Sequence, residues 1–314
     1  MQIIGLVQTA LELGLISSLT VLALFLSYSM LNICDLSTDG CFTLGATVGA
    51  VVAISGHPYL SIAAAMLAGV CSGFTTAFLQ TKMGINSLLA GIIVNTGLYS
   101  INIAVMGNSS LLNMNKTETV FTRLKAVLAD TVFSGQYRLI IALIAVALVI
   151  LFLSLFLRTR LGLAIRATGD NPDMVQASSI NPVFTSIVGL CISNSITGLS
   201  GCLLAQSQKS VNIDIGTGMV TIALASLLIG RAFMGRGKIP VQAVGAVLGA
   251  FVFRLVYTVA LRFDLPAYML KLVSSVIVII AIAGPYFRSQ MPVIRRRLQH
   301  RTVRPAEDGG KAVE

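Results

Sequence analysis

Long runs of apolar residues, separated by short polar stretches, dominate the pattern of this 314-residue chain. A helix needs about 20 mainly apolar residues to cross a bilayer. Runs near that length predict spanning helices near 12–31, 59–80, 86–106, 139–157, 183–205, 218–234, 239–260 and 269–287. The pattern therefore predicts an all-α fold, a polytopic transmembrane helical bundle of about eight to ten membrane segments.

A further apolar run, residues 42–55, is shorter and follows the polar stretch NICDLSTDG at 32–40. Non-helical backbone at membrane depth is tolerated only where protein or a water-filled cavity covers it. The pattern is therefore typical of a broken or re-entrant segment beside a pathway. A plain short span, with Asp35 and Asp39 at the membrane interface, is an equally open interpretation.

The most polar internal stretch is RTRLGLAIRATGDNPDMVQASSINP, residues 158–182, which has apolar runs on both sides. It is too polar for lipid and too short for a domain, so we expect a loop. Within it, Asn171-Pro172 predicts the start of a short helix, because proline suits the first helical turn. That helix would offer Met174, Val175, Ala177 and Ser178 to a partner. Alternatively, the arginines of the loop only set membrane orientation.

Composition places the chain among membrane proteins, with 55% hydrophobic residues, 11% charged residues and a mean hydropathy of +0.88. If the loop 158–182 is cytoplasmic, alternation puts 14 of the 22 Lys and Arg residues inside, half of them in the tail. We expect one transmembrane domain, 1–287, with an outer loop at 107–138, and a basic, disordered cytoplasmic tail, 288–314. The side of the N-terminus stays open. The net charge of +10 lies in loops and tail without interleaved aromatics, which argues against nucleic acid as a partner.

Two local patterns refine this picture. Residues 117–130, TETVFTRLKAVLAD, predict an amphipathic helix in the outer loop, lying on the membrane surface or contacting an external partner. The GxxxG spacings Gly45/Gly49 and Gly245/Gly249 predict close packing of helices.

Motifs for catalysis are absent from the sequence. A P-loop requires GxxxxGK[ST]; the nearest string, GRGKIP at 235–240, lacks the upstream glycine and has Ile239 in the Ser/Thr position. His57 and His300 lie far apart, and the five cysteines show no CxxC spacing. We therefore expect no enzyme activity, no ATP site in this chain, no metal and no cofactor.

Carboxylates are nearly absent from the inner portions of the predicted spans, whereas ion-coupled transporters usually place them there. Arg254 is the clear intramembrane charge; it either extends to the membrane surface or pairs with a substrate carboxylate or a neighbouring subunit. This pattern favours coupling to a separate motor, with 158–182 as its docking surface. An ion-coupled secondary transporter and a non-transport scaffold or receptor are the alternatives.

Polar residues inside apolar runs are candidates for a translocation pathway. Three of them, Asn95, Tyr99 and Asn102, share one helical face by their i, i+4, i+7 spacing. Hydrogen bonding between helices is the competing interpretation. The candidate pathway residues are Asn95, Thr96, Tyr99, Asn102, Ser193, Asn194 and Thr197.

Four strings resemble a known family. They are TDGCFTLGA (38–46), TKMGINSLLAGIIVNTGLYSINIAVMG (81–107), LGLAIRATGDNPDMVQASSIN (161–181) and GAVLGAFVFRLVYTVALRFDLPAYMLKL (245–272). Together they resemble permease subunits of bacterial ABC importers, in the branched-chain amino acid and simple-sugar superfamily. The TGLYSIN block resembles the uncharacterised or aromatic-amino-acid (tryptophan/tyrosine-type) branch. Members often carry glycine where Ser179 stands and an acidic residue where Met269 stands.

The resemblance implies a subunit of an importer in the bacterial inner membrane, with a cytoplasmic C-terminus and an amino acid as its cargo. It implies a homodimer or paired permease, two cytoplasmic ABC ATPase subunits and an external substrate-binding protein. In this interpretation Gly169 permits a tight turn, Asp170 or Asn171 caps the docking helix, and Met174 with Ala177 fills an ATPase groove. The expected docking residues are Arg166, Ala167, Thr168, Gly169, Asp170, Asn171, Pro172, Met174, Ala177 and Ser178.

Overall fold

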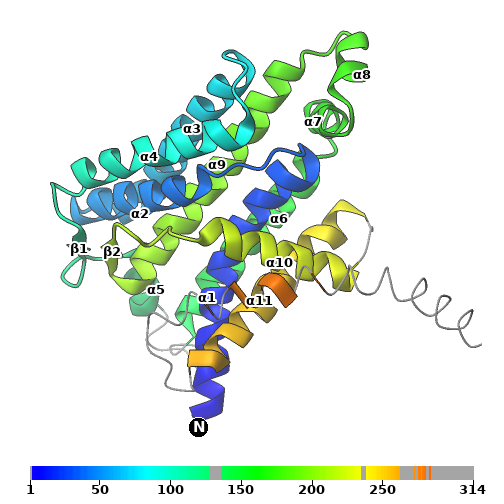
Figure 1. Cartoon of the computed structure of the whole chain (residues 1–314). Helices are drawn as coiled ribbons and strands as arrows, with labels where there is room; N and C mark the ends of the chain where they lie inside the picture. Colours follow the sequence, from blue (N-terminus) through cyan, green and yellow to red (C-terminus); the bar gives the residue numbers. More distant parts are fainter. Residues whose placement is uncertain are drawn as a thin grey trace, which may run out of the picture.

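The computed structural model describes residues 2–127, 136–234 and 238–261, together with a few helical positions between 272 and 283. These residues form a bundle of crossing helices with a small sheet at one end (Figure 1). The helices are α1 (Gln2–Leu24), the π-helix η1 (Phe25–Met30), α2 (Thr38–Ile54), α3 (Pro58–Thr81), α4 (Ser87–Val105), α5 (Val120–Val127), α6 (Tyr137–Phe156), α7 (Arg160–Asp170), α8 (Pro172–Ala177), α9 (Pro182–Gln208), α10 (Met219–Met234) and α11 (Ile239–Leu261). Strands β1 (Leu111–Asn113) and β2 (Ser210–Asn212) pair antiparallel, with Leu112 opposite Val211.

Six of the described helices are long and apolar enough to cross a membrane, which confirms the predicted polytopic helical bundle. They are Val7–Met30, Pro58–Thr81, Ser87–Val105, Tyr137–Phe156, Pro182–Gln208 and Ile239–Ala260, close to the predicted spans. The apolar helices α2 and α10 are shorter, at 17 and 16 residues. The predicted tail at 288–314 and most of the predicted span at 269–287 lie outside the described residues.

The chain leaves helical geometry between α1 and α2. The wider turns of η1 end at Met30, and residues 31–37 form no helix before α2 starts at Thr38. The predicted interruption is therefore present, although α2 begins inside the polar stretch rather than after it. π-helical turns of this kind frequently occur at functional sites.

The central helix of the bundle is α9, which packs against α1, α2 and α3 and is buried along most of its length. Close approach of the backbones depends on glycine: Gly45 on α2 lies directly against Gly198 on α9, leaving no room for a Cβ atom. Gly249 on α11 lies in the same way against the backbone of Ser226 on α10. Both predicted GxxxG pairs therefore contribute to helix packing.

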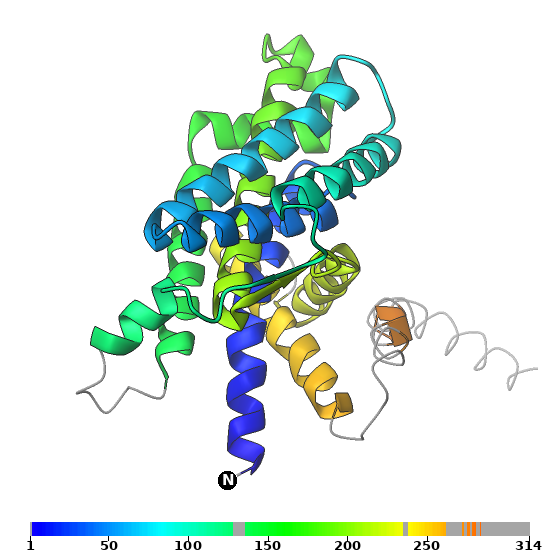
Figure 2. The ribbon, with the colours of Figure 1, turned by 90° about the vertical axis from the view of Figure 1, so that its left-hand side faces the viewer.

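The two ends of the bundle differ (Figures 1 and 2). One end carries α7, α8 and the connection from α3 to α4, and we call it the α7–α8 end. The opposite, β1–β2 end carries the sheet, α5 and the N-terminal end of α1. The predicted amphipathic helix of the outer loop is present as α5, which begins at Val120 instead of Thr117 and buries Phe121; residues 128–130 of the prediction lie outside the described residues.

Candidate functional site

A polar pocket of 380 Å³ opens where three segments meet: the start of α2, the middle of α4 and the loop between β2 and α10. Its lining consists of Asp39, Gly40, Thr43, Asn95, Thr96, Tyr99, Ser100, Asn102, Ile213, Asp214 and Thr217. All four of the α4 residues predicted for the pathway, Asn95, Thr96, Tyr99 and Asn102, line this pocket.

The α4 side chains present both fixed and free polar groups. Asn102 is 1% exposed, and its Nδ2 donates to the carbonyl oxygen of Gly40 at 3.2 Å. Its Oδ1 is buried and has no hydrogen-bond partner among the described residues. Tyr99, in contrast, is 51% exposed. Because a buried acceptor without a partner is costly, Asn102 leaves a site for a donor from water or a ligand.

Asp39 links two helices that both begin at the pocket. It lies in the first turn of α2, and its two carboxylate oxygens accept from the N–H groups of Gly218 at 2.9 Å and Val220 at 2.8 Å. These N–H groups belong to the start of α10, where the helix dipole favours a negative charge. Asp39 therefore joins the start of α2 to the start of α10, and its place at the membrane interface stays a prediction.

Asp35, just before α2, is fully buried in the bundle. Its Oδ1 accepts from the Ser37 N–H at 2.8 Å and the Ser37 hydroxyl at 2.6 Å, and its Oδ2 accepts from Asn194 Nδ2 at 2.7 Å. Thr76 on α3 donates to the Ser37 hydroxyl at 3.0 Å. Asp35 therefore lies inside the bundle in the non-helical stretch between η1 and α2, outside the predicted spans, and its depth in the membrane stays a prediction.

The three α9 residues predicted for the pathway lie in the packed interior instead of the polar pocket. Ser193 donates to the carbonyl oxygen of Ala23 at 2.7 Å, Asn194 donates to Asp35, and Thr197 donates to the Ser193 carbonyl oxygen at 3.2 Å. Each is at most 2% exposed. Ser193 joins α9 to α1 and Asn194 joins it to the α2 start, whereas Thr197 bonds within α9; the structure therefore does not bring the three together with the α4 group.

The predicted short helix after Asn171-Pro172 is present as α8. Asn171 supplies its cap, because its Oδ1 accepts from the Met174 N–H at 3.0 Å. Met174 is 63% exposed, and Ala177 and Ser178 are exposed beside it. Val175 is buried, so its predicted availability to a partner is wrong: it faces the protein.

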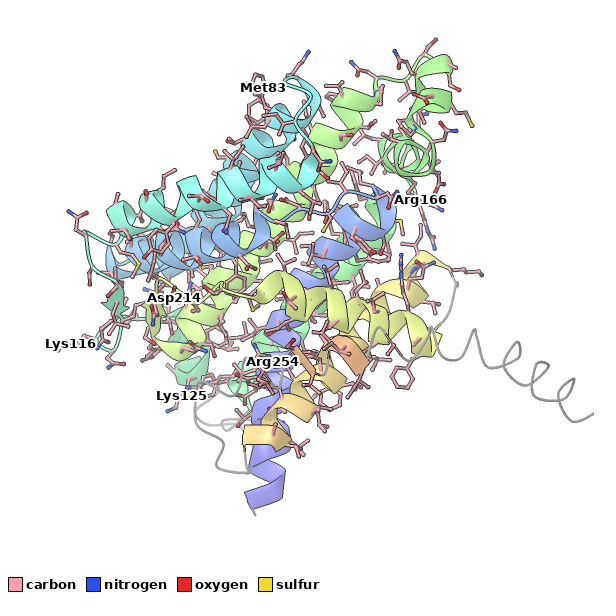
Figure 3. The ribbon with its side chains drawn as sticks, viewed as in Figure 1. Met83, Lys116, Lys125, Arg166, Asp214 and Arg254 are labelled. Atoms are coloured by element: carbon pink, nitrogen blue, oxygen red, sulfur yellow. The ribbon has the colours of Figure 1, made fainter. Side chains whose placement is uncertain are left out.

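The end of α7 anchors this segment to the bundle. Thr168 is buried, and its hydroxyl lies 2.8 Å from that of Thr185 on α9. Gly169 lies against the backbone of Met30 and Leu31, with no space for a Cβ atom. Because Gly169 is inside α7, its predicted role in a tight turn is wrong; it allows close packing. Arg166 and Ala167 are half-buried, whereas Asp170, Asn171 and Pro172 are exposed (Figure 3).

Ser179, just after α8, has a backbone conformation that explains why glycine is often found at this position in the family that the chain resembles. Its φ of +61° lies in the left-handed region that favours glycine. The Ser179 N–H donates to the Gln176 carbonyl oxygen at 3.1 Å, and the Ile180 N–H donates to that of Val175 at 3.2 Å. These two bonds form a Schellman motif, which usually has glycine at this position.

Arg254 on α11 is held by α1. Its Nη2 and Nε donate to the Ser17 hydroxyl at 2.9 and 3.2 Å, and its guanidinium carbon is 5.7 Å from the centre of the Tyr257 ring (Figure 3). The predicted extension to the membrane surface is therefore corrected to an α1–α11 contact.

Helices of membrane-spanning length, a polar pocket at helix starts and a protruding helix pair define a multi-pass membrane protein of the transporter class. Residues 6–282 match the branched-chain amino acid transport system / permease component family, and the chain belongs to that family. The predicted resemblance to ABC importer permeases is thereby confirmed.

Individual relatives agree with this family. The chain is 31% identical over 272 residues to a tyrosine transport system permease of Clostridioides difficile, covering 86% of this chain and 88% of that protein. It is 23% identical over 251 residues to the ribose import permease RbsC of Escherichia coli, covering 79% and 75%. It is 25% identical over 236 residues to the probable branched-chain amino acid permease LivH of Methanocaldococcus jannaschii, covering 73% of each. No solved structure matches the chain.

Proposed function

We propose that this chain is the permease subunit of a bacterial ABC importer and forms the pathway of a small solute, an amino acid, across the inner membrane. Two such chains, identical or paired, would meet around the pathway, with two ATPase subunits on the cytoplasmic side. An external binding protein would deliver the solute. The α7–α8 end would then be cytoplasmic, as would the C-terminus, and the β1–β2 end with the N-terminus would face outward.

The observation that carries this proposal is the exposed helix α8, which is joined to the bundle by α7. Met174, Ala177 and Ser178 project from a helix that is already capped by Asn171. The same segment is fixed to α9 by Thr168 and to the end of η1 by Gly169. A force applied to α8 by an ATPase would therefore reach two helices of the bundle, as coupling to a bistable element requires.

The polar pocket supports the pathway part of the proposal. Tyr99 and Thr96 lie on an exposed face of α4, next to the unpartnered Oδ1 of Asn102. A second permease chain across this face would enclose the pocket, and the acceptors would receive donors such as an ammonium group. The tyrosine and branched-chain relatives favour an amino acid, whereas the ribose relative makes sugars the competing class. In the assembled importer, water-soluble thiol reagents should label Tyr99→Cys and leave Thr197→Cys unlabelled.

Docking is tested with the full importer purified from its host. We expect a subunit with a Walker-A motif to copurify with the chain. Ala177→Trp should abolish both this association and solute uptake, because an indole ring cannot enter a groove shaped for a methyl group. Met83→Trp is the matched control: Met83 is 61% exposed at the same end but belongs to the α3–α4 connection (Figure 3). Ala177→Trp protein that retains the ATPase and normal uptake would disprove docking at α8.

Asp35 favours a second candidate, an ion-coupled transporter, because a buried carboxylate is a frequent proton or sodium site. Its oxygens already accept three hydrogen bonds, which favours a structural role. Vesicles that contain this chain alone distinguish the candidates. Accumulation driven by a proton or sodium gradient, and lost in Asp35→Asn, would support ion coupling and contradict the ABC importer.

A further inference from the structure

The protein has a second cavity, an apolar groove between four helices of the bundle. This groove has a volume of 660 Å³ and is bounded by α3, α5, α6 and α9. Its walls are almost entirely apolar, and it reaches inward to Ile196 and Leu203 of α9, which are 3% and 2% exposed. Because the groove is open to the surface and apolar, an apolar chain is better suited to it than water when the protein is in a membrane.

The length of the groove matches one leaflet of a bilayer. On α6 its lining runs from Ile141 to Phe152, and on α3 from Tyr59 to Val70. At about 1.5 Å per residue each stretch is about 16 Å long, roughly half of the ~30 Å hydrocarbon core. The groove is thus as long as an acyl chain that enters from the β1–β2 end.

The mouth of the groove carries side chains of the kind that contact a lipid headgroup. α5 crosses this mouth, with Arg123 5.5 Å from the ring centre of Tyr59 on α3 and Lys125 5.9 Å from that of Tyr137 on α6. Arg138 lies 5.7 Å from the same Tyr137 ring. Tyrosines at this level are typical of the membrane interface, and the cations complement a phosphate.

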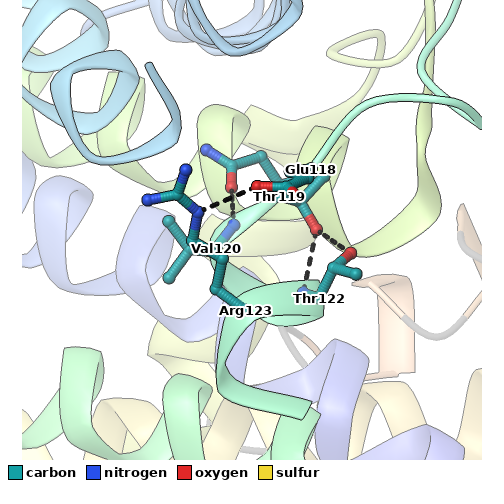
Figure 4. Close-up of polar contacts among 6 residues, drawn as sticks. Glu118, Thr119, Val120, Thr122 and Arg123 are labelled. Carbon is teal, nitrogen blue, oxygen red and sulfur yellow. Dashed lines mark hydrogen bonds and ion pairs between the residues drawn. The ribbon is translucent and has the colours of Figure 1, made fainter. Parts of the chain in front are cut away.

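α5 is held rigidly in this position (Figure 4). The Oε1 of Gln206, a buried residue on α9, accepts from the Val120 N–H at 3.0 Å, and Gln206 Nε2 donates to the Ser61 hydroxyl on α3 at 2.7 Å. The Thr119 hydroxyl accepts from the Thr122 N–H at 3.2 Å, and Glu118 pairs with Arg123 at 3.2 Å. The cations are thus placed above the groove by contacts that do not depend on an occupant.

We infer that an anionic phospholipid occupies this groove, with one acyl chain between α3, α6 and α9 and its phosphate against Lys125, Arg138 and Arg123. The outward face of α6 favours lipid over a second copy of the chain: its exposed residues outside the groove, such as Leu143, Leu151 and Leu155, are apolar. The face of α4 carries Thr96 and Tyr99 and is the better one for a second permease. The assignment of this lipid to the outer leaflet rests on the proposed function, because it uses the proposed orientation of the chain. The rest of the inference does not depend on that orientation.

The test uses the full chain in nanodiscs with phosphatidylglycerol that carries a diazirine in its acyl chain. Photolabelled residues are mapped by mass spectrometry, and phosphatidylcholine with the same chains serves as the reference lipid. We expect labelling concentrated on groove residues and preferred for phosphatidylglycerol by roughly tenfold, given the attraction of surface cations for anionic lipid. Ala145→Trp, which fills the groove, should abolish this labelling, whereas Leu143→Trp on the outer face of α6 should preserve it.

A charge variant tests the headgroup site separately. Lys125→Gln/Arg138→Gln should remove most of the preference for phosphatidylglycerol. The matched control, Lys116→Gln/Lys209→Gln, removes two charges from the same end of the bundle at residues that do not line the groove, and should keep the preference. Labelling spread evenly over all apolar faces, or an unchanged lipid preference in the Lys125/Arg138 variant, would each overturn the proposal.

Discussion

Two helices, α2 at Thr38 and α8 at Pro172, begin where the helical geometry of the chain is interrupted. The starts of these two helices are stabilised in different ways. At α8 the Asn171 side chain binds the Met174 N–H, so the contact is local and lies in an exposed segment. At α2 the buried Asp35 binds Asn194, and Asp39 binds Gly218, partners 159 and 179 positions away. The buried start therefore depends on the assembled bundle, whereas the exposed start is locally complete and available to a partner.

Removal of Asp35 should produce the largest effect. Asp35→Ala leaves the N–H of Ser37 and the amide of Asn194 buried without their acceptor, which should lower the free energy of unfolding by about 3–5 kcal/mol. The thermal unfolding midpoint of the purified chain in detergent measures this loss. The tertiary bond to Asn194 makes the effect global rather than confined to the α2 start.

Asp39→Ala provides the comparison for that measurement. Asp39 is half-buried, and its loss removes a contact to a helix start, which typically contributes about 1–2 kcal/mol. Its unfolding midpoint should therefore lie clearly above that of Asp35→Ala. Equal midpoints would show that the two carboxylates contribute equally to the free energy of unfolding. That result would contradict the difference expected from their burial.

Removal of the α8 cap should have a smaller, local effect. Asn171→Ala loses one cap bond, about 1 kcal/mol, in an exposed helix of six residues. We expect an unchanged unfolding midpoint and a clear loss of solute uptake per ATP hydrolysed, because α8 frays where the proposed ATPase grips it. Asn171→Asp retains the capping oxygen and should restore uptake. Loss of uptake in both variants would show that the amide, rather than the helix cap, is required.

The same contrast explains what sequence reasoning achieved. Apolar runs revealed the spanning helices, and Asn171-Pro172 revealed α8, because both signals are local. The polar face of Asn95, Tyr99 and Asn102 also followed from spacing along one helix. The roles of Asp35, Asp39 and Gly169 depend on partners brought close only by folding, and no local pattern contains them. Val175 was misassigned because the packing side of a six-residue helix depends on what lies beneath it.

The smallest predicted effect concerns the end of α8, where two adjacent serines differ in backbone conformation. Ser179 has φ of +61°, so Ser179→Gly removes roughly 1 kcal/mol of left-handed strain and adds about 0.5 kcal/mol of unfolded-state entropy. The net gain of about 0.5 kcal/mol should slow hydrogen exchange of the Ile180 amide, which closes the Schellman motif. At Ser178 φ is −87°, so Ser178→Gly relieves no strain; it carries the entropic cost, loses the bond from the Ser178 hydroxyl to the Met174 carbonyl oxygen, and should speed that exchange. Equal effects of the two substitutions would mean that backbone strain at Ser179 does not limit the stability of α8.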